Sequence, residues 1–136
     1  MQEADGLAAA ARTWYTAAME DISYAELGLC AVGPVPYKLV AFHAQQAAEK
    51  GLKAFLVSRN VDFPYTHNIR LLLNLCSDHA EWVERLRDTE SLTPFAVALR
   101  YPGIGREVAA DEARTAVRLA REVLDAVGKA LDEPAP

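Results

Sequence analysis

The stretch FHAQQAAEKGLKAFL, residues 42–56, constrains the fold more than any other part of the chain. At 100° per residue, its long polar side chains fall on one narrow arc of a helix, while small and apolar side chains fill most of the remaining circumference. We define this polar arc by five residues: His43, Gln46, Glu49, Lys50 and Lys53. Alanine and glycine on the broad face allow neighbouring helices to approach closely. The pattern predicts a buried helix whose polar arc is either a solvated edge or the wall of a groove.

Three long helices are predicted from apolar residues that recur at helical spacing. Their ranges are about 5–29, 37–58 and 111–131. Gly33 and Pro36 lie between the first two, where proline removes a backbone donor and biases the preceding residue away from helical geometry.

Shorter helices are expected in the intervening part of the chain. Thr66 is the predicted N-cap of a helix over about 67–77. Asp78, with Glu81 three residues later, resembles a capping box that opens a further helix.

Thr93, followed by Pro94, predicts the start of one more short helix, over about 95–101. No segment alternates with period two, and the connections are short. The predicted fold class is therefore all-α: an antiparallel up-and-down four-helix bundle with one or two additional short helices. A length of 136 residues suits a single domain over 1–136, with an ordered core over about 5–131.

Composition narrows the classes of function. The chain is 51% hydrophobic and 24% charged, which is ordinary for a soluble globular protein. Its formal charge of -5 works against a general phosphate-binding surface, since nonspecific nucleic-acid affinity grows with the number of cations. No apolar run reaches the roughly 20 residues of a membrane helix, and the N-terminus lacks the zones of a signal peptide. We therefore expect a cytoplasmic protein that does not enter a membrane.

Cys30 and Cys76 are the only cysteines, too few for a zinc ribbon, and both are expected to be buried, reduced thiols. No pair of histidines or carboxylates has the spacing of a zinc or di-iron site. The sequence therefore predicts no metal and no cofactor.

Three motifs, QQAAEKGLKAFL, FPYTHNIRLLL and ALRYPG, resemble those of the HEPN family, the higher eukaryotes and prokaryotes nucleotide-binding domain. The resemblance extends over nearly the whole chain. The residues that match family positions are Asp21 in the first helix, Gln46, Glu49, Lys50 and Lys53 in the second, His67 in a Thr-His turn, and Arg100, Tyr101 and Pro102 in an RYP segment.

This resemblance implies a bundle of four or five helices, usually a homodimer, often encoded beside a minimal nucleotidyltransferase as a toxin-antitoxin pair. Some members are metal-independent ribonucleases that use an arginine and a histidine four to six residues apart, whereas seven residues lie between Arg59 and His67 here. No histidine follows Arg100. Because the ribonuclease motif is not matched, the first interpretation is a noncatalytic or weakly catalytic domain.

The polar arc and the RYP segment form the candidate ligand site. Lysines would offer cations to a phosphate, and imidazole and amide groups would offer hydrogen bonds. The residues assigned to nucleotide or phosphate binding are His43, Gln46, Lys50, Lys53, Arg100 and Tyr101. The alternative is a solvated helix edge on which Glu49 and Lys53 form an i,i+4 pair worth only about a few tenths of a kcal/mol.

Two further residues have structural and chemical interpretations. Asp21 lies at the margin of an apolar stripe, so it is expected to be partly buried and to pair with Lys50 or Arg100. His67 lies at a helix N-terminus, where the dipole favours a neutral ring. It could act as a general base, with Arg59 or Arg100 stabilising the phosphorane, or it could fix the turn through hydrogen bonds to the backbone.

Three functions remain open at this point. The first is a HEPN-like domain that binds a nucleotide or RNA phosphate and pairs with a nucleotidyltransferase. The second is a metal-independent ribonuclease toxin that uses His67 with Arg59 or Arg100. The third is a dimeric interaction module without a ligand, in which a stripe of arginines on the last helix meets an acidic surface: Arg114, Arg118 and Arg121.

Overall fold

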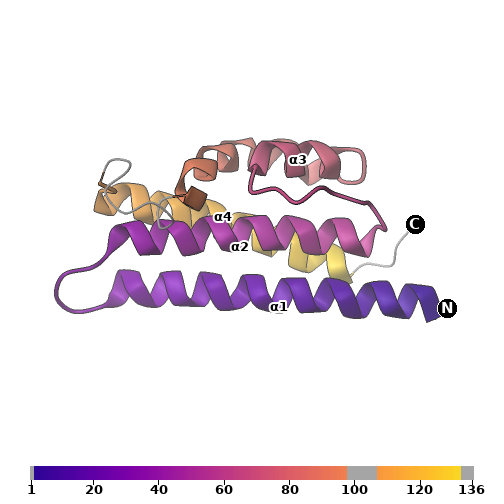
Figure 1. Cartoon of the computed structure of the whole chain (residues 1–136), viewed down its shortest axis with the longest axis horizontal. Helices are drawn as coiled ribbons and strands as arrows, with labels where there is room; N and C mark the ends of the chain where they lie inside the picture. Colours follow the sequence, from indigo (N-terminus) through magenta and orange to yellow (C-terminus); the bar gives the residue numbers. More distant parts are fainter. Residues whose placement is uncertain (1, 98–106, 133–136) are drawn as a thin grey trace.

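The computed structural model describes residues 2–97 and 107–132. Over these residues the chain forms four α-helices and one 3-10 helix (Figure 1). Their bounds are α1 Gln2–Cys30, α2 Tyr37–Ser58, α3 Ile69–Ser77, η1 Glu81–Val97 and α4 Ala110–Asp132, of which η1 is the 3-10 helix.

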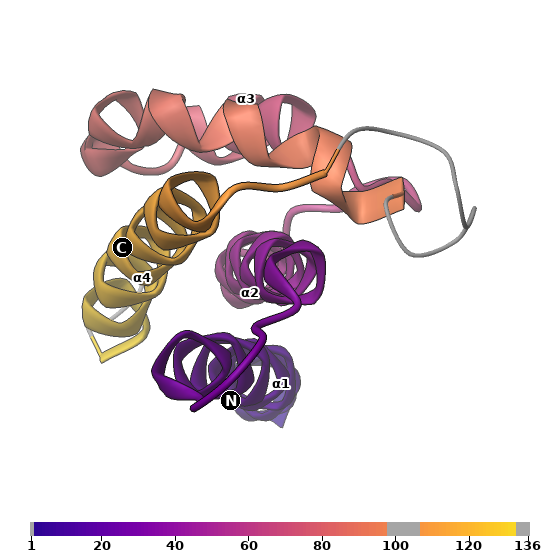
Figure 2. The ribbon, with the colours of Figure 1, turned by 90° about the vertical axis from the view of Figure 1, so that its left-hand side faces the viewer.

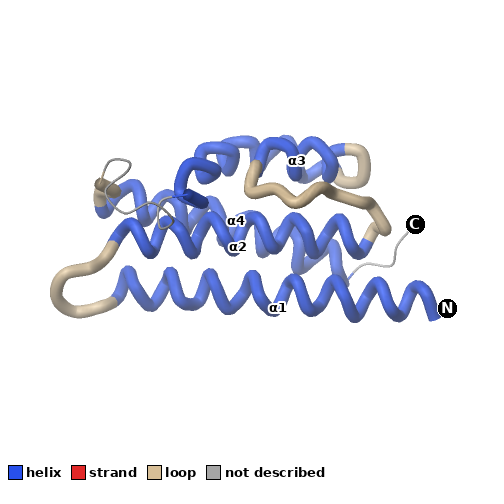
Figure 3. Tube along the Cα trace, in the orientation of Figure 1, coloured by secondary structure: helices blue, strands red, loops and turns tan. Residues whose placement is uncertain are grey.

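Helix α2 occupies the centre of the bundle and contacts every other helix (Figure 2). Helices α1 and α2 run antiparallel, α4 packs against both, and α3 with η1 covers the side of α2 opposite α1. Figure 3 shows helices joined by loops, with no strand in the part of the chain that the structure describes. The prediction of an all-α bundle is confirmed, and α3 followed by η1 fills the place of the fourth helix. No helix among the described residues has both the length and the apolarity needed to cross a membrane.

The start of α3 differs from the prediction. The helix begins at Ile69, and its N-cap is Asn68, whose side-chain oxygen accepts a hydrogen bond from the Leu71 N–H. Thr66 acts one step earlier, where its hydroxyl accepts from the Asn68 N–H at 3.1 Å. The two polar residues therefore act in succession, and His67 lies between them in the turn.

The region after α3 corrects two further predictions. Asp78 is the C-cap of α3 and does not open a new helix. The expected α-helix and the expected helix start at Thr93 merge into the single 3-10 helix η1, with Pro94 inside it. Thr93 instead accepts a hydrogen bond from the Ile69 N–H, which ties η1 to the start of α3. Residues 98–101 of the predicted last short helix lie outside the described residues.

The spacing of buried residues explains the 3-10 winding of η1. The buried positions Val83, Leu86, Thr89 and Leu92 recur every three residues, and the last buried position, Ala96, follows after four. A 3-10 helix has 3.0 residues per turn, so these four side chains align on one face, whereas an α-helix would rotate them progressively away from the core.

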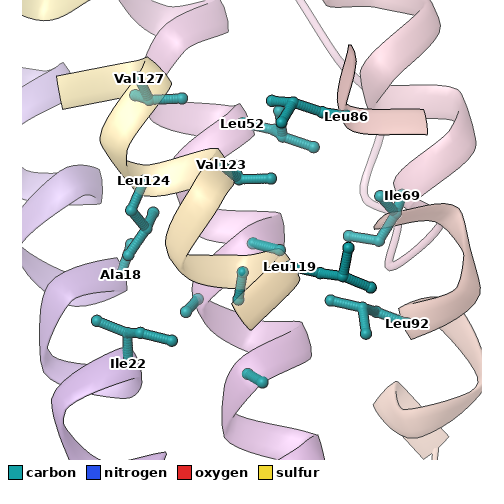
Figure 4. Packing of buried hydrophobic residues seen from close by; sticks show 14 of the residues in the cluster. Ala18, Ile22, Leu52, Ile69, Leu86, Leu92, Leu119, Val123, Leu124 and Val127 are labelled. Carbon is teal, nitrogen blue, oxygen red and sulfur yellow. The ribbon is translucent and has the colours of Figure 1, made fainter. Parts of the chain in front are cut away.

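The core is formed where the five helices meet (Figure 4). Ile22 of α1, Leu52 of α2 and Leu124 of α4 are each fully buried. The close approach of α2 to α4 depends on Gly51, because a Cβ atom there would collide with the Leu124 side chain. The broad small-residue face of α2 therefore lets a neighbouring helix approach closely, as predicted.

The two cysteines have different environments. Cys76 of α3 is buried, and desolvation raises the pKa of its thiol to about 12. Cys30 is exposed, so the prediction of its burial is wrong. It is the last residue of α1, where the chain leaves the bundle for the connection to α2.

Replacing Gly51 by alanine tests the contact between α2 and α4. We expect Gly51→Ala to lower the free energy of unfolding by about 1–3 kcal/mol, the usual effect of overpacking. The matched control is Gly6→Ala in α1, where a Cβ meets nothing within 4 Å. That change should raise stability by about 0.5–1 kcal/mol through helix propensity. Urea denaturation measures both, and equal stabilisation by the two substitutions would contradict the close approach.

Candidate functional site

Two matching sets of polar side chains lie on α2 and its neighbours. The Asp21 set consists of Asp21, His43 and Lys50, and the Glu49 set consists of Glu49, His67 and Lys53. In each set one carboxylate bonds to a histidine Nδ1 and to a lysine Nζ. The two sets therefore repeat the same chemistry at neighbouring places.

The Asp21 set joins α1 to α2. The Asp21 Oδ1 atom lies 2.9 Å from His43 Nδ1, and Oδ2 accepts from Lys50 Nζ at 2.7 Å. The Asp21 side chain is 12% exposed, against 25% for His43 and 29% for Lys50. The carboxylate is thus covered while the two groups bonded to it still reach solvent.

The Glu49 set joins α2 to the 59–68 connector, the segment between α2 and α3. The Glu49 Oε1 atom lies 2.7 Å from His67 Nδ1 and accepts from Gln45 Nε2 at 3.1 Å. The Oε2 atom accepts from Lys53 Nζ at 3.0 Å. This buried carboxylate is therefore held by three donors.

Lys53 is enclosed, although it belongs to the polar arc. Its side chain is 5% exposed, and its ammonium lies 5.6 Å from the ring centroid of Trp14, 5.7 Å from that of Phe63 and 5.8 Å from that of Tyr65. Cation–π attraction adds to the ion pair with Glu49. The alternative of a solvated edge is thus wrong for Glu49 and Lys53, because α1 and the 59–68 connector cover that end of the arc.

Gln45 is a polar residue of the site that was not predicted from the sequence. It is fully buried, donates to Glu49 and to the His67 backbone oxygen, and accepts from Gln46 Nε2 at 2.6 Å. On the helical projection, Gln45 falls among the small residues of the broad face, outside the polar arc. A signal was present, since a glutamine four residues before a buried glutamate can bond to it along the helix.

Both imidazoles are oriented by carboxylates. A carboxylate accepts hydrogen bonds, so the Nδ1 atoms of His43 and His67 act as donors. In the neutral ring this tautomer puts the lone pair on Nε2. Glu49 therefore fixes the orientation of the His67 ring.

Each imidazole also lies against a tyrosine ring. The ring centroids of Tyr24 and His43 are 4.5 Å apart, and those of Tyr65 and His67 are 5.4 Å apart. Both tyrosines are exposed, Tyr24 at 56% and Tyr65 at 85%. Neither tyrosine was expected at the site from the sequence.

Arg59 lies apart from the two sets. Its guanidinium donates to the Ser58 hydroxyl and to the Ala130 carbonyl, and it stacks on Phe55 at 4.8 Å. It also lines a hollow of about 330 Å³ with Arg12 and the first turns of α1. Position 59 is about 15 Å from Glu49 along the helix axis, at 1.5 Å per residue. These contacts do not bring Arg59 to His67, and Arg100 and Tyr101 lie outside the described residues.

The arginines of α4 bond to acidic side chains. Arg114 pairs with Asp111 and Arg118 pairs with Glu122, both within α4. Arg121 pairs with Glu26 of α1, and this bond raises the pKa of the arginine. Part of the predicted stripe therefore serves the contact between α1 and α4. Over the described ranges, no group of three or more metal-ligating side chains is placed to hold a metal ion.

Substitution of Lys53 tests the Glu49 set. We expect Lys53→Met to lower the free energy of unfolding by about 3–5 kcal/mol, because it leaves a buried carboxylate without its cation. The double change Lys53→Met with Glu49→Gln should cost less, since it removes both charges. Arg12→Ala is the control, because its pair with Asp132 is exposed and should be worth about 1 kcal/mol or less. Additive effects of the two core substitutions in urea denaturation would contradict the coupling.

Comparisons with known proteins agree with this architecture. A family model described as the HEPN domain matches residues 11–130. The crystal structure of TT1696 from Thermus thermophilus is similar, with a TM-score of 0.68 and 30% sequence identity, over 88% of this chain and 96% of the other. No curated protein matches the chain. Since the family model covers most of the sequence and the resemblance of its motifs is confirmed, the chain belongs to the HEPN family.

Proposed function

We propose that this HEPN domain binds a nucleotide or an RNA phosphate on the face of α2 between the two sets. The observation that carries the proposal is the arrangement of His43, Lys50 and His67, three partly exposed groups held in place by the partly buried carboxylate of Asp21 and the buried carboxylate of Glu49. Gln46, also partly exposed, lies between them on α2. Side chains that are oriented before binding lose less conformational entropy when a ligand arrives.

The charges of the two sets favour a small anionic group. Each set is neutral when its imidazole is neutral, so binding depends on directed hydrogen bonds more than on a general positive field. An ammonium has three N–H donors, and Asp21 takes one of those of Lys50 in the described structure. The others can donate to phosphate oxygens, in the charge-assisted bonds that are the stronger kind.

Membership of the HEPN family supports two kinds of partner, a second copy of the chain and a nucleotidyltransferase. We propose that the chain forms a homodimer and pairs with a minimal nucleotidyltransferase, as the resemblance implies. Light scattering on the purified chain distinguishes a dimer from a monomer.

Titration of ATP, GTP and a short RNA tests the binding proposal. A ligand that binds only the folded state raises the thermal midpoint. We expect Lys50→Gln to weaken binding by about tenfold or more, the effect of losing one charge-assisted bond. Arg114→Gln, on the exposed side of α4, is the control and should bind as the unmodified chain does. If none of the three ligands moves the midpoint, the chain is better described as an interaction module.

A second candidate is metal-independent cleavage of RNA, with His67 as the general base. It is favoured by the 2.7 Å bond from His67 to Glu49, which orients the ring so that Nε2 can accept the proton of a ribose hydroxyl. The group that would stabilise the phosphorane is Arg100 in this hypothesis, since Arg59 bonds elsewhere.

Incubation of RNA with the pure protein in EDTA tests the second candidate. Cleavage should fall by about 100-fold or more in His67→Ala, the usual contribution of a general base. His79→Ala is the matched control, because His79 is an exposed histidine just after α3. Cleavage that is absent, or equal in the two variants, would reject this candidate and leave the binding proposal in place.

A further inference from the structure

The hollow beside Arg59 lies at the end of the bundle where α1 begins and where α2 and α4 end (Figure 1). We call it the Arg59 hollow. Its volume of about 330 Å³ is at the lower end of the range for small-molecule pockets, which is about 300–1,000 Å³. Most of the residues that line it have side chains of carbon alone: Ala4, Leu7, Ala8, Ala11 and Leu131. The hollow therefore suits a small molecule with an apolar part.

The polar part of the lining carries one cation that no carboxylate compensates. Arg12 lines the hollow but bonds to Asp132 at 2.7 Å, so its charge is paired. The Arg59 guanidinium donates to the Ser58 hydroxyl at 3.1 Å and to the Ala130 carbonyl at 3.2 Å, and both of these acceptors are neutral. Within residues 2–97 and 107–132, no carboxylate bonds to Arg59. The hollow therefore has a positive charge to offer an anion.

The structural role of Arg59 leaves donors for a ligand. Carbonyl groups at the C-terminus of a helix carry partial negative charge, which explains why a cation lies where α2 and α4 end. The bonds to Ser58 and Ala130 use two of the five N–H groups that a guanidinium has. Arg59 is also only partly exposed, and an electrostatic bond there is weakened less by water than one on the open surface.

We propose that the Arg59 hollow binds a small monocarboxylic acid, with the carboxylate on Arg59 and the hydrocarbon chain against Leu7, Ala8 and Leu131. A carboxylate is planar and matches a guanidinium through two parallel N–H···O bonds. One negative charge balances the one unpaired cation, whereas a phosphate dianion would leave a charge in excess beside Asp132. This site is separate from the polar face of α2, so the inference does not depend on the proposed function.

Titration of the ¹⁵N-labelled chain with hexanoate, followed by NMR, tests the inference. We expect saturable shifts of the backbone amides of Leu7, Ala8 and Leu131. Acetate has the charge without the chain, and hexan-1-ol has the chain without the charge. Each methylene that is buried strengthens binding by about fourfold, and a charge-assisted bond strengthens it by about tenfold. Both comparison ligands should therefore bind at least about tenfold more weakly than hexanoate.

Two pairs of matched variants locate the site. Ala8→Phe fills the hollow and should abolish the shifts, whereas Ala9→Phe adds the same ring at an exposed neighbour that does not line the hollow. Arg59→Gln should weaken hexanoate binding by about tenfold or more. Arg114→Gln removes the same charge near the other end of α4, about 25 Å away at 1.5 Å per residue, and should bind as the unmodified chain does.

The thermal midpoint of each variant shows whether it is folded, since Arg59 also ties α2 to α4. If Arg59→Gln does not fold, the pair at positions 8 and 9 still decides the outcome. Equal binding by Ala8→Phe and Ala9→Phe, or no shift at the three amides, would reject the site. Equal binding of hexanoate and hexan-1-ol, or of Arg59→Gln and Arg114→Gln, would reject the carboxylate. None of these results changes the test of nucleotide binding, which depends on Lys50.

Discussion

The buried carboxylate of Glu49 is the interaction on which the rest of the site depends. It bonds to Lys53 and Gln45 on its own helix and to His67 on the 59–68 connector. A carboxylate at 4% exposure would be costly without such donors. The same three bonds fix the turn before α3 and the orientation of the His67 ring, so one charge determines both the path of the chain and the geometry of a candidate functional group.

Asp21 performs the same role between α1 and α2, with a more open environment. Both groups bonded to it remain more than a fifth exposed, whereas Lys53 in the other set is enclosed by three rings. The two sets therefore differ in what they offer a ligand: the Asp21 set presents a cation and an imidazole, and the Glu49 set presents mainly an imidazole.

The fold could be predicted from the sequence in segments where apolar residues recur with the period of an α-helix. The 3.6-residue period of α1, α2 and α4 placed those helices to within a few residues. The three-residue period of Val83, Leu86, Thr89 and Leu92 was equally regular, but it was interpreted with α-helical geometry. Asp78 and Thr93 were each predicted from the local sequence to begin a new helix. Asp78 is instead the C-cap of α3, and the Thr93 hydroxyl accepts a hydrogen bond from the Ile69 N–H.

The site was only partly predictable, because separation in sequence is not separation in space. Arg59 is closer to His67 than to Glu49 in sequence, but it follows α2 to its end and bonds to Ala130 of α4, while the connector returns to place His67 beside Glu49. Likewise, Lys53 shares an arc with Lys50 on a helical projection. Only the positions of Trp14 and Phe63, which belong to other segments, decide that it is enclosed.

The enclosure of Lys53 has a consequence for the motions of the 59–68 connector. This segment has no regular helix, and loops of that kind usually open locally at little cost. Here, lifting the connector would remove two rings from the ammonium and one donor from Glu49. Amide hydrogens near Phe63 that are hydrogen-bonded in the native state would consequently exchange with solvent as slowly as those of the helices. The connector, although it has no regular secondary structure, would then be as rigid as the helices.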